Sequence, residues 1–483
     1  MTQVKRSIAA LLLAALAVLP GFGCKSTATT QANVVAAQAK PITLEYWGVF
    51  TDTDDMDVLI KGFQANHANI RINYRKFRPE EYEQKLLEAF AEDRGPDLFT
   101  VHNNNLGHYL TKLAPMPANI PFFVFMKQGS GLSEKVVVTP DTRPGLTIKH
   151  LRDKFVGVVE SDVLAFATPT STQKSIFALP FFVDSLALYY NHDLLAQNQI
   201  TKPAADWEDL LTQAQKYTKP ADVDERSKGI TQAIVPFGTG TNVHRASDLL
   251  VTLMMQNGSA VTAPNGRVSF NSKVVNKDGS EQIPGVDALG YYLDFADPKQ
   301  AAYTWNTEQG DALDAFAQGR VPYYFGYSYD ASTIQARNPR LNFDINPILT
   351  PRDSTTKAVT ANYWIEAVSK KSRNINEAWL FISEAATNKD PLAAFLKRTK
   401  RASALNELIQ TQLEDPDVGV FAKQALTSRS WYHGKDGAAV DAIMTTMIEK
   451  AHNVILTPAE NQDTAKLLEA AVGQAATQIN DTL

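Results

Sequence analysis

Hydrophobic and polar positions follow two alternating periods just after residue 41. Apolar and polar residues alternate over residues 42–46, which is the pattern of a half-buried strand. Apolar residues then recur at helical spacing over 56–63, behind an acidic cluster suited to a helix N-terminus, and alternation returns over 70–74. A strand, a helix and a strand in so few residues predict a βαβ unit with parallel strands.

The stretch that follows predicts a second helix and a third strand. The helical pattern begins after Pro79, and the segment GPDLFTVHNNN, residues 95–105, supplies a turn and a strand. Ligands of α/β proteins collect beyond the carboxyl ends of the strands. We therefore expect a ligand near Trp47 and Gly48, and near the residues from His102 to Asn105, including Asn104.

Later segments repeat this mixture of helices and strands, so the fold class is α/β. A helix is predicted over 207–217 with Asp206 as its cap, and a strand over 321–326. Asn374, followed by a glutamate three places on, resembles a capping box. The last 80 or so residues are predicted to be wholly helical, and no internal repeat is present.

The N-terminus has the plan of a secretory signal peptide. Two basic residues precede an apolar run at 8–19, which is shorter than the ~20 residues that span a membrane. The segment resembles the lipobox of bacterial lipoproteins, which implies that residues 1–23 are removed and that Cys24 receives a lipid. Residues 24–40 would then form a flexible tether. The alternative is a plain secretory signal with an incidental cysteine.

Composition narrows the classes of protein that remain. The 483 residues allow two or three domains, and a single cysteine excludes an internal disulfide. The 47 Lys and Arg against 52 Asp and Glu form no long block of one sign, so nucleic acid is not an expected partner.

Motifs for catalysis and for cofactors are incomplete. GYSYD, residues 326–330, ends in Asp330 where a nucleophile elbow has glycine, and GTGTNV, residues 238–243, lacks the endings of the dinucleotide fingerprint and of the P-loop. The histidines form no cluster at ligand spacing. The sequence therefore predicts no enzyme, no cofactor and no metal, although a carboxylate pair for glycoside hydrolysis can be judged only in space.

Aromatic residues stand beside polar turn residues at several places. Such flat apolar faces next to carboxylates and amides suit sugars, whose rings stack and whose hydroxyls take hydrogen bonds. The set favours a carbohydrate cleft, and it comprises Trp47, Trp305, Tyr327, Tyr329, Trp364, Trp431 and Tyr432.

Several segments, in order, resemble the extracellular solute-binding proteins of sugar ABC importers, the group that includes maltose-binding protein. They include IFALPFFVDSLALYYNHDLL at 176–195, DAFAQGRVPYYFGYSYD at 314–330 and ANYWIEAVSKKS at 361–372. The resemblance implies a two-lobed, periplasmic-binding-protein-like (class II) fold. It places hinge crossings near 183–188, 342–347 and 401–405.

The resemblance also implies lobe boundaries and ligand contacts. Lobe one would comprise residues 41–184 plus 346–401, and lobe two 185–345 plus 402–483. Asp184 at the hinge would accept hydrogen bonds from sugar hydroxyls, and its alternative role is to cap the segment that follows it. The expected ligand contacts are Trp47, Asn104, Asn105, Asp184, Trp305, Tyr327, Trp364 and Trp431.

Taken together, these features predict a lipid-anchored substrate-binding protein on the outer face of a membrane or in the periplasm. It would capture a carbohydrate, as a monomer, and deliver it to separate permease and ATPase subunits of an ABC importer. A binder of another polar solute, a sensor or adhesin, and a hydrolase are the alternatives.

Overall fold

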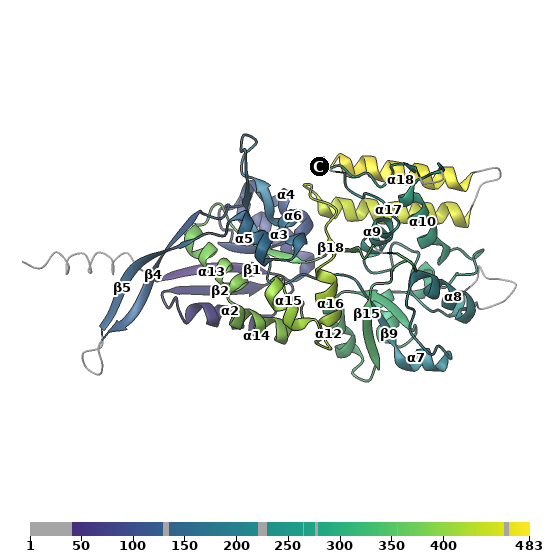
Figure 1. The fold of residues 1–483 in the computed structure, drawn as a ribbon, viewed down its shortest axis with the longest axis horizontal. Coiled ribbons are helices and arrows are strands. Elements are labelled where there is room, and N and C mark those ends of the chain that lie inside the picture. Colours follow the sequence, from purple (N-terminus) through teal and green to yellow (C-terminus); the bar gives the residue numbers. More distant parts are fainter. Residues whose placement is uncertain are drawn as a thin grey trace, which may run out of the picture.

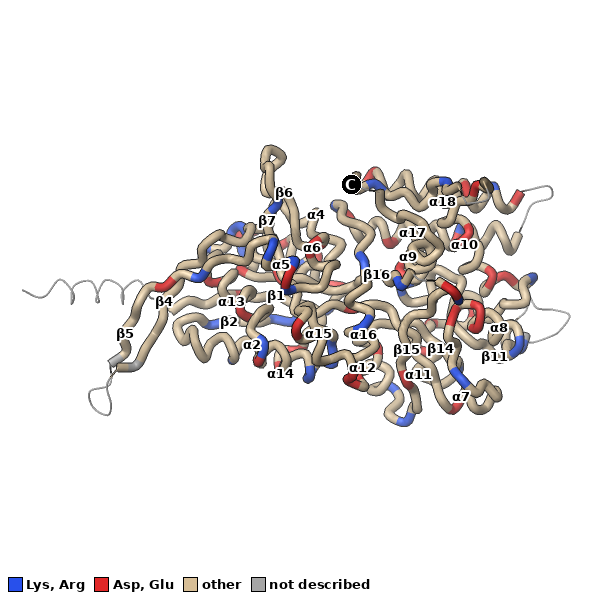
Figure 2. The backbone as a smooth tube through the Cα atoms, viewed as in Figure 1, with Lys and Arg blue, Asp and Glu red and all other residues tan. Residues whose placement is uncertain are grey.

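The computed structural model describes residues 41–128, 135–220, 229–263, 265–275, 279–354, 356–457 and 463–483. The predicted signal peptide, Cys24 and the tether lie outside the described residues. Within the described part, no helix is long and apolar enough to cross a membrane. Two lobes lie side by side (Figure 1), and positive and negative residues are interspersed over both (Figure 2).

Lobe one is built on a five-stranded sheet with the order β2-β1-β3-β17-β8. β1 pairs in parallel with both β2 and β3, whereas β17 runs antiparallel to β3 and β8. The predicted βαβ unit is confirmed. The strands are β1 (Ile42–Gly48), β2 (Ile70–Lys76), β3 (Leu98–His102), β8 (Ala178–Leu179) and β17 (Trp364–Val368).

Helices cover this sheet. The predicted first helix is α2, which buries Met56, Leu59, Ile60 and Phe63, so its helical spacing reflects packing against the core. The helices of lobe one are α2 (Thr53–Gln64), α3 (Pro79–Ala91), α4 (Leu106–Tyr109), α5 (Ile148–Lys154), α6 (Gly157–Val163), α13 (Ile375–Thr387), α14 (Lys389–Thr399) and α15 (Asn406–Gln412). Lobe one also contains a short antiparallel pair of strands, β6 (Leu164–Phe166) and β7 (Lys174–Ile176).

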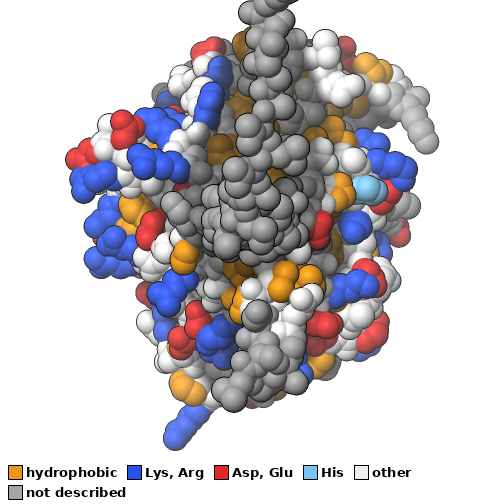
Figure 3. Space-filling view, turned by 90° about the vertical axis from the view of Figure 1, so that its left-hand side faces the viewer, with side chains coloured by type: hydrophobic (Ala, Val, Ile, Leu, Met, Phe, Trp, Pro, Cys, Tyr) orange, Lys and Arg blue, Asp and Glu red, His pale blue; other side chains and the backbone are white. Residues whose placement is uncertain are grey.

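A long antiparallel ribbon projects from lobe one at the end away from lobe two (Figure 1). It consists of β4 (Asn119–Gln128) and β5 (Lys135–Pro144), paired from Asn119↔Pro144 to Gln128↔Lys135. The sequence analysis assigned no element here. We call these two strands the arm, and Figure 3 views the end of the molecule that carries it.

Lobe two is built on a three-stranded antiparallel sheet with the order β14-β9-β15. Its strands are β9 (Ala187–Asn191), β14 (Tyr323–Gly326) and β15 (Phe343–Pro347), and the short pairs are β10 (Lys219–Pro220) with β11 (Ile230–Gln232) and β12 (Val274–Val275) with β13 (Glu281–Gln282). Its helices are α7 (His192–Gln197), α8 (Trp207–Tyr217), α9 (Ala246–Gln256), α10 (Pro284–Asp294), α11 (Ala312–Ala317), α12 (Ser328–Arg337), α16 (Gly419–Ala425), α17 (Gly437–Leu456) and α18 (Thr464–Asn480).

The chain passes between the lobes later than expected at two crossings. Residues 342–347 were expected to cross, but β15 pairs with β9, and Gln256 of lobe two holds the carbonyls of Leu349 and Ala358 at 3.0 and 2.9 Å. The chain joins the sheet of lobe one only at β17. Residues 401–405 were the third expected crossing, but Leu405 bridges Phe155 of lobe one, so the chain leaves after α15.

Two local predictions are wrong and one is confirmed. The last 80 residues are not wholly helical, because β18 (Ser428–Arg429) pairs with β16 (Val359–Thr360). Asn374 makes no side-chain cap for α13. Asp206 does cap α8, where its Oδ1 accepts the Asp209 N–H at 2.7 Å.

Candidate ligand-binding site

A cavity of about 250 Å³ lies where the two lobes meet, just below the ~300–1,000 Å³ typical of ligand clefts. Lobe one contributes the end of β3 and the start of β17, and lobe two contributes the first turns of α9 and α17. The wall is formed by His102, Asn104, Asn105, Arg245, Ser247, Asp248, Asn362, Trp364, Trp431, Tyr432, Gly437, Ala438, Val440 and Asp441.

The lobe-one wall is an aromatic surface set by strand register. Trp364 opens β17 directly opposite His102, the last residue of β3, and their rings meet edge to face at 5.2 Å. Phe50, which follows β1, packs against Trp364 at 5.4 Å and stacks on Tyr329 of lobe two at 5.8 Å. The aromatic contacts therefore continue from one lobe into the other.

The lobe-two wall carries the charges. Arg245 begins α9 in the left-handed conformation, with φ at 59°, which is uncommon for a residue with a side chain. Its guanidinium lies 3.7 Å from the carboxylate of Asp248 and 4.0 Å from that of Asp441. Ser247 donates a hydrogen bond to Asp441. One cation and two carboxylates thus face the cavity.

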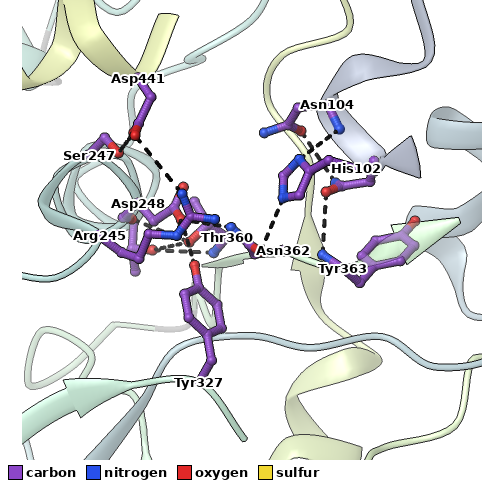
Figure 4. A network of polar contacts seen from close by, with 12 residues as sticks. His102, Asn104, Arg245, Ser247, Asp248, Tyr327, Thr360, Asn362, Tyr363 and Asp441 are labelled. Atoms are coloured by element: carbon purple, nitrogen blue, oxygen red, sulfur yellow. Dashed lines mark hydrogen bonds and ion pairs between the residues drawn. The ribbon is translucent and has the colours of Figure 1, made fainter. Parts of the chain in front are cut away.

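A chain of hydrogen bonds connects the two walls (Figure 4). His102 and Asn362 are joined between Nε2 and Oδ1 at 3.1 Å, and the amide nitrogen of Asn362 donates to Asp248 Oδ2 at 3.1 Å. The side chain of Asn362 thus supplies the amide that bridges the two walls.

The protonation of His102 follows from its two contacts. Its Nδ1 accepts the backbone N–H of Asn104 at 3.4 Å, so Nε2 carries the hydrogen that Asn362 accepts. Burial, together with the charge of Arg245, lowers the pKa of His102 to about 4. The imidazole is therefore neutral at physiological pH and acts as a hydrogen-bond donor in the wall.

Tyr327 lies one layer behind the cavity. Its ring is fully buried, and its hydroxyl donates to Asp248 Oδ2 at 2.6 Å. Burial raises the pKa of Asp248, and the neighbouring Arg245 opposes that rise. The expected aromatic platform for a sugar therefore acts instead as a support for a carboxylate of the wall.

Asp184 does not line the cavity. It is 4% exposed, and its carboxylate accepts the Ser328 hydroxyl at 2.7 Å and the Ser328 and Ser185 backbone N–H groups at 3.1 and 2.9 Å. Burial raises its pKa to about 6. Its oxygens accept mainly from Ser328 at the start of α12, a segment distant in the sequence, so Asp184 holds this helix start rather than the segment that directly follows it.

Trp305 and Trp47 are also outside the cavity wall. Trp305 is fully buried in the core of lobe two and is not among the residues that line the cavity. Trp47, the residue before the end of β1, is half-buried, with its ring 4.6 Å from that of Phe77 and the Arg75 guanidinium 5.8 Å from its ring. Of the expected contacts, the structure brings together Asn104, Asn105, Trp364 and Trp431.

A second buried carboxylate fixes the segment that carries Trp431. Asp162 of α6 accepts the hydroxyls of Tyr363 and Ser430 at 2.6 and 2.7 Å, and it lies 2.9 Å from Nε2 of His433. Residues on both sides of Trp431 are therefore held to lobe one. The position of the indole is set by these bonds.

A larger groove of about 690 Å³ lies between α6 and the segment around β18. The described residues that line it include Lys357, Arg429 and several hydroxyl side chains, but no aromatic ring and no carboxylate. The smaller cavity has both. Among the described residues, no group of His, Cys, Asp and Glu side chains could hold a metal ion.

The sequence analysis missed Arg245, Asp248 and Asp441, which supply the charges of the wall. For Asp248, the sequence held one indication of a functional role. It is the only charged residue of α9, and every residue of that helix is buried, so a carboxylate there requires partners.

The chain belongs to the bacterial extracellular solute-binding protein family, whose model matches residues 58–419. A probable ABC transporter-binding protein of Deinococcus radiodurans is 24% identical over 281 residues, or 57% of this chain. That match covers 62% of the relative, less than two thirds of its length. The family resemblance inferred from the sequence is confirmed.

Solved structures share the fold at low identity. The cyclic alpha-maltosyl-1,6-maltose binding protein of Arthrobacter globiformis has a TM-score of 0.65 at 16% identity, over 91% of this chain and all of its own. An ABC substrate-binding protein of Listeria monocytogenes, in complex with cycloalternan, has a TM-score of 0.62 at 17% identity, over 92% and 99% of the two chains. A solute-binding protein of Thermotoga lettingae, bound with alpha-D-tagatose, has a TM-score of 0.61 at 17% identity, over 91% and 99%. The predicted two-lobed fold is confirmed.

Proposed function

We propose that this protein captures a carbohydrate, an oligosaccharide or part of one, in the cavity between its lobes and delivers it to the permease of an ABC importer. The observation that carries the proposal is the composition of that cavity. Trp364 and Trp431 offer apolar faces for sugar rings, and Asn104, Asp441 and Arg245 offer acceptors and donors for hydroxyl groups.

The charges favour a neutral ligand over an acidic one. Arg245 is already flanked by Asp248 and Asp441, so the described wall carries one more negative than positive charge. A free carboxylate or phosphate on the ligand would be repelled by this excess of negative charge. Similar folds solved with cycloalternan and with tagatose support a neutral sugar.

Capture requires that the ligand bind the closed arrangement of the two lobes more tightly than the open one. A ligand that touches both walls binds best when the lobes are together, so it shifts the population toward that arrangement. Within this proposal the protein is an exported monomer held to the membrane through a lipid on Cys24. The pore and the ATPase are separate subunits, and the bound sugar is not hydrolysed.

A thermal-shift screen tests the ligand class, because a ligand that binds only the folded state raises the melting temperature by mass action. The panel contains neutral monosaccharides and oligosaccharides, uronic acids and polyamines. We expect neutral sugars to raise the melting temperature of the parent more than that of Trp431→Ala. A shift with polyamines alone would overturn the proposal, and release of free monosaccharide on incubation would identify a hydrolase.

A further inference from the structure

The arm presents apolar side chains on both of its faces. Residues paired across an antiparallel ribbon share a face, so Phe125 and Val138 lie on one face, and Met126 and Val137 lie on the other. Met126 is 45% exposed and Val136 is 59% exposed. Among the described residues, Phe122 at the base packs against the main core, but the apolar residues farther out do not.

A ribbon of this kind needs a partner. An isolated two-stranded hairpin is marginally stable in water, and the arm pairs with no third strand in the described part of the chain. In its outer half both faces carry apolar side chains, so neither face turns a wholly polar side toward water. Other features at the same end of lobe one indicate what the arm contacts.

Basic side chains surround the base of the arm. β17 ends beside the start of β3. The turn that follows β17 carries Lys370 and Arg373, so it lies at the same end of lobe one as the arm. The Lys370 N–H donates to the carbonyl of Lys112. Arg71 lies at the start of the neighbouring strand β2. Within the described ranges, Arg71, Lys112, Lys370 and Arg373 form no ion pair. Figure 3 shows Lys and Arg side chains around the rim of this end, interspersed with Asp and Glu.

The chain enters lobe one beside the arm. Ile42 N–H donates to the carbonyl of Asn69 at 2.8 Å, and the ring of His67, two residues earlier, contacts Phe122 at 5.4 Å. Seventeen residues separate Cys24 from Ile42. The flexible tether expected from the sequence would span about 23 Å at that length, and ten residues of a strand span about 33 Å. The arm is therefore long enough to reach the surface to which Cys24 would be attached.

We propose that this end of lobe one lies on an anionic lipid bilayer, with the arm at the boundary between headgroups and acyl chains and the basic residues on the headgroups. Apolar contact and attraction to anionic lipid are the two terms that hold a protein in this interface. Only the reach of the arm depends on the proposed lipid anchor. Nothing in this inference depends on the ligand of the cavity.

Co-sedimentation with vesicles tests the proposal on residues 25–483, which include every described residue and lack the leader and Cys24. The vesicles are of phosphatidylcholine, with or without phosphatidylglycerol. We expect the parent to bind the anionic vesicles and to release as salt is raised. Phe125→Ser with Met126→Ser should lower binding at least tenfold, and Lys370→Gln with Arg373→Gln should lower it about tenfold on anionic vesicles only.

Matched controls lie on lobe two. Val275→Ser removes an apolar side chain that is 66% exposed, and Arg340→Gln removes an exposed cation, and both should bind vesicles as the parent does. Equal binding by parent and arm variant would overturn the proposal. So would a dimer, seen by light scattering, that the arm variant dissociates, because a second copy would then cover the arm. Sugar binding, measured on the same variants, reports separately on the proposed function.

Discussion

The side-chain amide of Asn362 donates a hydrogen bond to Asp248, with Nδ2 3.1 Å from Oδ2, and its oxygen lies 3.1 Å from Nε2 of His102. One side chain at a crossing between the lobes thus satisfies a group on each of them. Since both partners are buried or nearly so, the bridge contributes to the stability of the two-lobed arrangement and to the shape of the cavity wall.

Asn362→Ala should lower the free energy of unfolding by about 1–3 kcal/mol, because His102 and Asp248 each lose a partner in a buried setting. The same variant should bind ligand more weakly, since the wall is no longer fixed. Denaturant titration and calorimetry measure the two effects. Asn66→Ala, at an exposed residue whose side chain makes no hydrogen bond within the described residues, is the control, and equal losses in both variants would rule out the bridge.

Trp364→Ala and Trp431→Ala should each weaken sugar binding at least tenfold, or about 1.4 kcal/mol, because each removes an aromatic face of the cavity. Trp379→Phe is the matched control. Trp379 is fully buried in lobe one and donates to the carbonyl of Ala114, so its replacement should lower stability and leave affinity unchanged. Calorimetry on the folded variants measures these affinities. If both alanine variants bind the sugar as tightly as the parent, this cavity is not the sugar site.

The stability of the protein should depend on pH through Glu366. This carboxyl is buried in β17, where it accepts the Thr100 hydroxyl at 3.0 Å, and burial raises its pKa to about 7. The folded state therefore keeps a proton that the unfolded state loses above its own pKa near 4.5. The resulting contribution to stability is full at low pH and is lost as pH rises to 7.

Glu366→Gln should remove that contribution, because the amide oxygen can still accept from Thr100 and no proton is lost. Denaturant titrations at pH 5, 6, 7 and 8 should show a parent whose free energy of unfolding falls between pH 5 and 7 more steeply than that of the variant, by up to about 1.4 kcal/mol per pH unit. Parallel curves for the two proteins would show that Glu366 is not responsible.

Cys24→Ser should change how the protein is held at the membrane. A lipid on Cys24 resists high salt, whereas the contacts proposed for the arm and the basic rim are weakened by it. We expect the parent to remain with membranes after a high-salt wash and the variant to be released, still folded by its melting curve. Retention of the variant after the wash would argue against lipid attachment at this cysteine.

The parts predicted well from the sequence are those set by local periodicity. The alternation over 42–46 and the helical spacing over 56–63 report on which side chains face the core, so β1 and α2 were found within a few residues. Asn104 and Trp364 were placed correctly near the cavity because strand ends and family order fix their neighbourhood.

The errors concern partners distant in the sequence. Asp184 was expected to bind sugar, but Ser328, 144 residues away, occupies its oxygens. Tyr327 was expected to stack on sugar, but its hydroxyl donates to Asp248, 79 residues away. The arm was missed because its strands are apolar on both faces, which leaves no alternation to read.

A crystal structure of the protein with the neutral sugar that most raises its melting temperature would show directly where the ligand binds. We expect a sugar ring between the lobes, in contact with Trp364 or Trp431, and hydroxyl groups within hydrogen-bonding distance of Arg245 or Asp441. A sugar found in the groove beside α6, or one that touches only a single lobe, would contradict this expectation.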